Sequence, residues 1–193
     1  MSADAARPDD AADDDLVTAA RAGDRRALEL LLDRHADRIH AVCRRIVGDP
    51  HDALDATQEA MIAVARGITR FDGTARFTTW CYRVATNAAL DELRRSRRRP
   101  VPADPPGTVA DPHDGTTAVE ARLDVDAALA TLPEEFRVAV VLRDLCDLDY
   151  AEIATALALP PGTVRSRIAR GRAALAAALG EPDPAAERRK EDA

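Results

Sequence analysis

Apolar residues recur every three or four positions along much of this chain, which is the spacing of a helix that buries one face. The first stripe comprises Leu28, Leu31, Leu32, His35, Ile39, Val42 and Ile46. It follows Asp24, a suitable helix N-cap, and stops before Gly48 and Pro50, which end helices. Two later stripes comprise Leu54, Thr57, Met61, Val64 and Ile68, and then Trp80, Val84 and Ala88. The pattern predicts a helical bundle in the first half.

Helical periodicity returns in the second half, where we expect four helices. The first spans about 117–131, and Pro133 suits the first position of the next, because its missing N–H costs nothing there. A short helix from Tyr150 to Ala158, a tight turn and a longer helix to about Leu179 predict a helix-turn-helix. The inner stripe of the last helix comprises Val164, Ile168, Gly171 and Leu175, and Ala154 is small enough for a close crossing.

Composition separates these halves. Residues 100–116 hold five of the 12 prolines, so this stretch cannot continue a helix and is interpreted as a flexible linker. Residues 1–12 and 181–193 are polar and are expected to be disordered tails. Aromatic residues make up only 3% of the chain, which disfavours strands. We therefore predict an all-α protein with small helical domains at 13–99 and 117–180.

The distribution of charge changes what the total suggests. A formal net charge of -7 argues at first against a nucleic-acid partner, because phosphates attract Lys and Arg. The arginines, however, gather in two clusters, within 94–99 and 165–172, while acidic residues gather at the N-terminus and in the middle. This segregation indicates two kinds of partner surface.

The last predicted helix has an outer face without acidic residues. That face carries Arg165, Ser166, Arg167 and Arg170. Guanidinium groups can donate to guanine edges in the major groove, and backbone amides at a helix start can bind phosphate. A solvated basic face is the alternative, but the combination with the predicted turn and the small Ala154 favours DNA binding.

An acidic strip lies on the helix that follows Pro50. It comprises Asp52, Asp55, Gln58 and Glu59, which share one face opposite the apolar stripe. Taken alone, the strip fits a solvated surface and a docking surface for a basic partner helix equally well.

The helix that leads into the first arginine cluster has a polar and basic face. The face carries Arg83, Asn87, Asp91, Arg94, Arg95 and Arg98, and the aromatic residues Phe77 and Trp80 precede it. Arginines interleaved with aromatic rings suit single-stranded DNA, because bases stack on rings while phosphates meet guanidinium groups. Core packing is the more common role for such rings.

No pattern in the chain indicates a cofactor or a metal. Cys43, Cys81 and Cys146 are far apart and lack zinc-ligand spacing, so we expect reduced, buried thiols. No apolar run reaches the roughly 20 residues that span a bilayer, and the acidic N-terminus is unlike a signal peptide. We expect a cytoplasmic protein that does not insert into a membrane.

Three segments follow one another in an order found in a known family. They are DPHDALDATQEAM, FDGTARFTTWCYRVATNAALDELRRSRRR and LPEEFRVAVVLRDLCDLDYAEIATALALPPGTVRSRIARGRAAL. Over nearly all of residues 13–180 the chain resembles extracytoplasmic-function (ECF) sigma factors of the sigma-70 family, and actinobacterial members most of all. The resemblance implies a σ2 domain at 13–99, a σ4 domain at 117–180, and a factor that directs RNA polymerase to promoters.

The resemblance also implies roles for residues. By this resemblance, the residues that dock on the clamp helices of the polymerase β′ subunit are Asp52, Asp55, Gln58 and Glu59. Reading and melting the −10 element falls to Trp80, Asn87, Asp91, Arg94 and Arg95. Reading the −35 element falls to Arg165, Ser166, Arg167 and Arg170, next to Ala169, where some relatives carry an aromatic residue. The implied partners are core polymerase (β and β′ subunits), promoter DNA and an anti-sigma factor.

The residues alone leave two other functions open. A stand-alone helix-turn-helix regulator would explain residues 133–179, but it gives the acidic and arginine-rich helices no role. A nuclease built on Asp52, Asp55 and Glu59 would lack a His or Lys partner, and the chain has no phosphate-binding loop. We therefore expect no catalytic residue and no enzyme activity.

Overall fold

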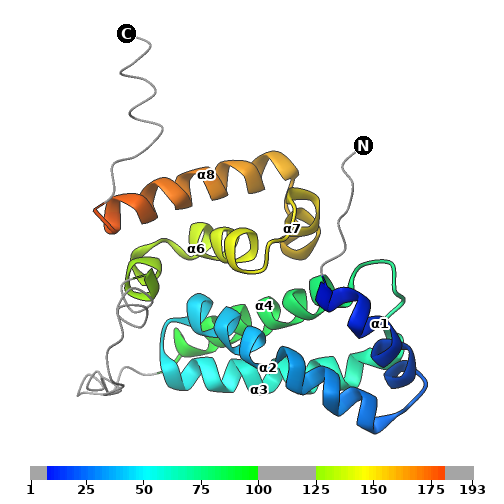
Figure 1. Ribbon diagram of the computed structural model, residues 1–193. Helices are drawn as coiled ribbons and strands as arrows, with labels where there is room; N and C mark the ends of the chain where they lie inside the picture. The colour runs from blue at the N-terminus through cyan, green and yellow to red at the C-terminus, as the bar shows by residue number, and fades with distance from the viewer. Residues whose placement is uncertain (1–7, 100–124, 181–193) are drawn as a thin grey trace.

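The computed structural model describes residues 8–99 and 125–180, and every regular element in these ranges is a helix (Figure 1). The all-α prediction is confirmed. The predicted linker 100–116, residues 117–124 and the tail 181–193 lie outside the described residues, as do residues 1–7. No described helix is long and apolar enough to cross a membrane.

The first domain is a helical bundle. Its elements are α1 (Pro8–Arg21), α2 (Arg25–Val47), α3 (Pro50–Gly67), a 3-10 turn (Ile68–Arg70) and α4 (Phe77–Ser96). α2, α3 and α4 pack against one another, and α1 lies against α2. The bundle encloses a core whose largest buried side chains include Leu31, Ile39, Ile46, Ile68 and Tyr82.

Helix caps explain where the long helices begin and end. The Asp24 carboxylate accepts from the backbone N–H groups of Arg26 and Ala27 at 2.8 and 3.2 Å, so the predicted N-cap of α2 is confirmed. Gly48 ends α2 with φ 91°, a left-handed value that glycine adopts at little cost. Asp49 then caps α3, whose first residue is Pro50.

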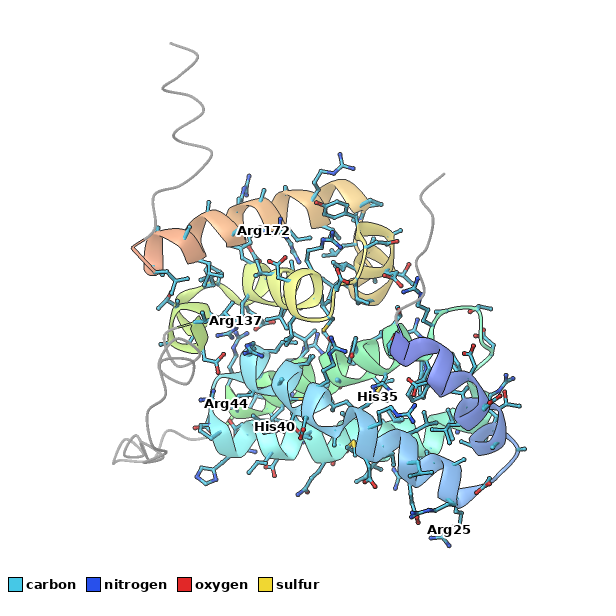
Figure 2. All side chains as sticks on the ribbon, in the orientation of Figure 1. Arg25, His35, His40, Arg44, Arg137 and Arg172 are labelled. Carbon is cyan, nitrogen blue, oxygen red and sulfur yellow. The ribbon has the colours of Figure 1, made fainter. Side chains whose placement is uncertain are left out.

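α1 begins at Pro8, inside the range 1–12 that its composition assigns to a disordered tail. Proline is favoured at the first helical position, and contacts with α2 hold the helix in place. Asp13 is 1% exposed, and its carboxylate accepts from Arg34 at 2.5 Å. It also lies 2.7 Å from Nε2 of His35, the residue that Figure 2 labels on α2. Composition could not reveal this buried pairing.

The buried stripe of α3 also differs from the prediction. Ala53, Ala56, Ala60 and Val64 face the core, whereas Leu54 is 51% exposed. Small side chains let α3 approach α2 and α4 closely, so the alanines take the positions that the pattern assigns to larger residues. Periodicity predicts the helix correctly, but the observed buried face lies about one residue away from the predicted one.

The second domain contains the four predicted helices. They are residues 125–131, α6 (Glu134–Val140), which continues as a π-helical turn (Val141–Leu145), α7 (Tyr150–Leu157) and α8 (Pro161–Ala178). Pro133 is the N-cap of α6, one residue before the predicted position. Its extended backbone, with ψ 138°, precedes the helix instead of joining it.

The two domains pack together in this structure, with α6 and the π-helical turn against α2 (Figure 1). Their buried apolar residues form one continuous core. Polar contacts join the domains as well: Thr79 donates to Glu152 at 2.7 Å, and Arg97 pairs with Glu134 at 2.6 Å. A third pair joins Arg45 and Asp126 at 2.9 Å.

Candidate nucleic-acid and partner interfaces

The helix-turn-helix is formed by α7, a tight turn and α8. α7 starts with a capping box, in which the side chains of Asp149 and Glu152 each accept from the other's backbone N–H at 2.8 Å. It ends at Ala158, which has a left-handed φ of 52°, and Pro161 begins α8. Ala154, predicted at the crossing, is 8% exposed. The structure therefore confirms the predicted motif.

The predicted inner stripe of α8 is buried, and it packs on α6. Val164 and Ile168 are almost fully buried, and Gly171 lies where the two helices are closest. A Cβ atom at Gly171 would lie 2.6 Å from Cγ2 of Val140 and 3.1 Å from the carbonyl oxygen of Phe136. This close packing fixes which face of α8 points outward.

The outer face of α8 brings the predicted residues together. Arg165, Ser166 and Arg170 are exposed, and Arg167 is half-buried. The Ser166 hydroxyl donates to the carbonyl oxygen of Thr163 at 2.9 Å, and Arg167 lies 4.0 Å from Glu135. Among the described residues, neither Arg165 nor Arg170 forms an ion pair with a carboxylate. Their N–H donors therefore remain available for a ligand.

Arg172, labelled in Figure 2, has a different role on the same helix. Its Nε donates to Asp144 at 3.1 Å, and a second N–H group donates to the other oxygen of that carboxylate. These hydrogen bonds raise the pKa of Arg172 above its usual value. The donors are used within the protein, so Arg172 fastens α8 to the π-helical turn.

The outer surface of α3 combines acidic, amide and apolar side chains. Asp55, Gln58 and Glu59 are exposed as predicted, and Leu54 and Ile62 are 51% and 43% exposed. We call these five residues the α3 face. The apolar pattern assigned Leu54 to the core and did not single out Ile62, although a spacing of eight residues places both beside the acidic strip.

Asp52 is not part of the α3 face. Its side chain is only 12% exposed, and it accepts from Arg99, which also donates to Glu92 at 2.8 Å. The hydrogen bond to Asp52 raises the pKa of Arg99. Oxygens of Asp52, Asp55 and Glu92 lie within 4.8 Å of one another, and the guanidinium of Arg99 offsets their repulsion. The expectation that Asp52 belongs to an exposed strip is wrong.

Most of the polar face predicted for α4 and the residues just after it is exposed. The exposed residues are Asn87, Asp91, Arg94, Arg95 and Arg98, whereas Arg83 is half-buried. Arg94 pairs with Asp91 at 2.6 Å, and Arg95 pairs with the buried Glu92 at 2.8 Å. Exposed pairs one helical turn apart contribute little stability, so a phosphate can compete for the Arg94 guanidinium.

Trp80 lies at the boundary between the core and this face. Its ring centroid is 5.1 Å from that of Phe71 and 5.8 Å from that of Phe77. Phe71 and Phe77 are buried, so both rings belong to the core. Trp80 is half-buried, packed on the phenylalanines on one side and open on another.

A hollow of about 230 Å³ borders Trp80 between the domains. Thr79 and Arg83 line it from α4, and Ala151 and Glu152 line it from α7. The Thr79–Glu152 hydrogen bond lies at the same place. In this arrangement the second domain covers part of the predicted −10 surface.

Together these features define a class of protein: a helical protein with a helix-turn-helix in one domain and, in the other, a helix whose exposed face combines apolar and acidic side chains. Comparisons give the family. The model of Sigma-70 region 2 matches residues 31–99, and the model of Sigma-70, region 4 matches residues 122–175. The ECF RNA polymerase sigma factor SigM of Mycobacterium tuberculosis is 40% identical over 169 residues, covering 87% of this chain and 85% of SigM. The chain belongs to the ECF sigma factors of the sigma-70 family, which bind core RNA polymerase and direct promoter-specific initiation.

Solved structures agree with this fold. CnrH, determined in complex with the cytosolic domain of CnrY, is 25% identical with a TM-score of 0.65, covering 88% of this chain and 97% of CnrH. The sigma factor RpoE of Bartonella quintana, determined with the anti-sigma factor NepR, is 18% identical with a TM-score of 0.63. It covers 79% of this chain and 96% of RpoE, and at that identity it supports the fold alone.

Proposed function

We propose that α8 reads the −35 element, that α4 and the loop before it engage the −10 element, and that the α3 face binds core polymerase. One observation carries the proposal: the outer face of α8 is exposed and basic while its inner face is buried against α6. Arg165 and Arg170 keep their donors available, as base reading in the major groove requires. Ser166 and Arg167 complete the face, and Glu135 competes for Arg167.

For polymerase docking, the α3 face offers apolar anchors between polar groups. Leu54 and Ile62 supply exposed apolar area, and Asp55, Gln58 and Glu59 supply acceptors for basic side chains of the β′ clamp helices. An apolar centre with a polar rim is the usual composition of protein interfaces. Asp52 contributes indirectly in this proposal, because Arg99 ties it to α4.

For the −10 element, α4 offers cations beside a partly open ring. Arg94 can exchange its carboxylate partner for a phosphate, whereas Arg95 keeps its pair with the buried Glu92. Asn87 and Asp91 lie on the same exposed face. Trp80 can stack an unpaired base on its open side. The second domain covers part of this surface, so we expect it to move when DNA binds.

The remaining assignments follow from the family. The catalytic step of transcription belongs to the polymerase, so we propose that this chain has no enzyme activity and acts in the cytoplasm, where core polymerase is found. Because CnrH, at 25% identity, was determined in complex with another protein, the cytosolic domain of CnrY, we propose a protein partner of the anti-sigma kind here too. It would cover the α3 face.

The docking assignment can be tested with Asp55→Arg, which places a cation at the centre of the α3 face. Asp33→Arg is a matched control, because Asp33 is an exposed acid on α2, away from that face. Each full-length variant is mixed with purified core polymerase and assayed by co-purification and by run-off transcription over a genomic promoter library. Wild type and the control should initiate, and Asp55→Arg should lose at least tenfold in core binding.

The outcomes separate the parts of the proposal. Equal co-purification of Asp55→Arg and wild type would overturn docking through the α3 face. Failure of the wild type to initiate at any promoter, with no inhibitor present, would overturn the function itself. Thermal unfolding of both variants identifies a loss caused by misfolding.

A further inference from the structure

Tyr150 is the first residue of α7 and is 37% exposed beside the start of α8. The capping box of Asp149 and Glu152 fixes its backbone. Two arginines contact its ring: the Cζ atom of Arg143 lies 5.5 Å from the ring centroid, and that of Arg165 lies 5.7 Å away. Both distances are within the range of cation–π attraction.

Arg143 is itself anchored. Its guanidinium donates to the carbonyl oxygen of Leu148 at 2.7 Å, and it lies 4.0 Å from the carboxylate of Asp147. It therefore holds the segment that leads into α7, where Asp147 has a left-handed φ of 54°. The backbone of Tyr150 is thus held by the capping box, and one of the two arginines at its ring is anchored.

The contact between Arg165 and the Tyr150 ring differs from an ion pair, because it leaves the N–H donors of the guanidinium available. A cation–π contact supplies no oxygen acceptor to the guanidinium N–H donors, whereas a carboxylate in an ion pair occupies them. Asp144 occupies donors of Arg172 at 3.1 Å, and Glu135 lies 4.0 Å from Arg167. The Tyr150 ring restrains Arg165 while leaving its donors for base edges. A free arginine side chain would lose its rotamer entropy only when DNA binds.

We propose that Tyr150 is a positioning residue for −35 recognition, which acts by holding the Arg165 guanidinium against its ring. The inference rests on the proposed reading of the −35 element by α8. The aromatic ring of Tyr150 positions Arg165, and its hydroxyl group is not needed for this. Loss of the ring should therefore weaken discrimination at the base pair that Arg165 reads, and leave the other base pairs unchanged.

The test uses full-length protein with core polymerase and a promoter library randomised across the −35 region. The template that wild type uses best, and its single-base variants, are then transcribed with each sigma variant. Tyr150→Phe keeps the ring, Tyr150→Leu keeps apolar bulk without it, and Tyr150→Ala removes both. We expect Phe to match wild type, and Leu and Ala to lose about fivefold in discrimination at one base pair.

Double variants show whether the effect passes through Arg165. In an Arg165→Ala background, Tyr150→Ala should cause no further loss at that base pair. Arg170→Ala is the matched control, because Arg170 does not contact the ring, and the two losses should multiply. Thermal unfolding midpoints exclude a general loss of folding.

Each other outcome overturns the proposal in its own way. Multiplicative losses for Tyr150→Ala and Arg165→Ala would show that the ring does not act through Arg165. A uniform loss in Tyr150→Phe at every template would show a hydroxyl contact to phosphate. If Arg165→Ala leaves every base preference intact, then −35 reading by Arg165 fails as well, which separates failure of the proposed function from failure of this inference.

Discussion

At the scale of single residues, arginines of the two clusters differ in whether their donors are free. Arg99 is committed to Asp52 and Glu92, and Arg172 to Asp144, whereas Arg165 meets only a ring. The sequence predicted the outer face of α8 from spacing. It could not show which cations are already paired, because Asp52 and Arg99 are 47 positions apart and meet only when α3 packs on α4.

The cysteines carry a prediction at the same scale. All three are buried, as the sequence predicts, and none forms a disulfide in the described part of the chain. Burial raises the pKa of Cys81 to about 12 and that of Cys43 to about 11, from an ordinary value of 9.0. Because the thiolate is the nucleophile, native protein at pH 8 should resist iodoacetamide and react only as fast as it unfolds.

The raised pKa also sets a pH dependence. The unfolded thiol loses its proton near pH 9, before the folded one, so its contribution to stability is complete below pH 9 and falls as the pH rises toward about 12. Urea unfolding at pH 8 and pH 10.5 measures this loss. Cys81→Ala should lose less stability than wild type over that interval. Rapid labelling of native Cys81, or equal losses in the two proteins, would contradict the prediction.

At the scale of elements, sequence periodicity predicted helix existence better than helix orientation. α8 was predicted in both position and facing, because Val164, Ile168 and Gly171 are apolar or small on one side and the other side is basic. For α3 the predicted buried face differs from the observed one, because its alanines are buried and Leu54 is exposed. A large apolar residue at a docking face looks like a core residue in the sequence. Only packing distinguishes the two.

The crossing of α6 and α8 can be tested at Gly171. Gly171→Ala would place a Cβ atom 2.6 Å from Val140 and 3.1 Å from a backbone carbonyl that cannot easily move, so the helices must separate. We expect a loss of about 1–3 kcal/mol in the free energy of unfolding. Urea denaturation measures it.

Gly162→Ala is the matched control on the same helix. A Cβ atom there meets nothing within 4 Å, and alanine is the better helix former. We expect no loss of stability from this variant. A loss at Gly171 no larger than that at Gly162 would show that the crossing of α6 and α8 does not determine the effect.

At the scale of the whole molecule, the observed packing of the domains differs from what promoter binding requires. By their names, the −10 and −35 elements are about 25 base pairs apart, or roughly 85 Å of duplex at 3.4 Å per base pair. A compact chain of this length has a radius of gyration of only about 16 Å. The second domain also covers part of the surface near Trp80. Both elements can be read together only if the domains separate.

The domain interface contains features that favour separation. Arg137 is 8% exposed, burial lowers its pKa, and its Nε has no hydrogen-bond partner among the described residues. Opening would return this charge to water. The contacts that oppose opening include the pairs Arg97–Glu134 and Arg45–Asp126. The sequence predicts two domains. It does not predict the interface between them, because the paired side chains are far apart in the chain.

Charge reversal at Arg97 tests this balance. Arg97→Glu places two carboxylates where the structure has an ion pair at 2.6 Å, so the closed arrangement should lose up to about 1 kcal/mol, or about fivefold in its ratio to open forms. Small-angle scattering of the free protein should then give a larger radius of gyration than for wild type.

Arg98→Glu makes the same change in net charge at an exposed position without an ion pair in the described part of the chain, and should leave the radius unchanged. Equal expansion in both variants would assign the effect to net charge, and no expansion in Arg97→Glu would show that this pair does not hold the domains together.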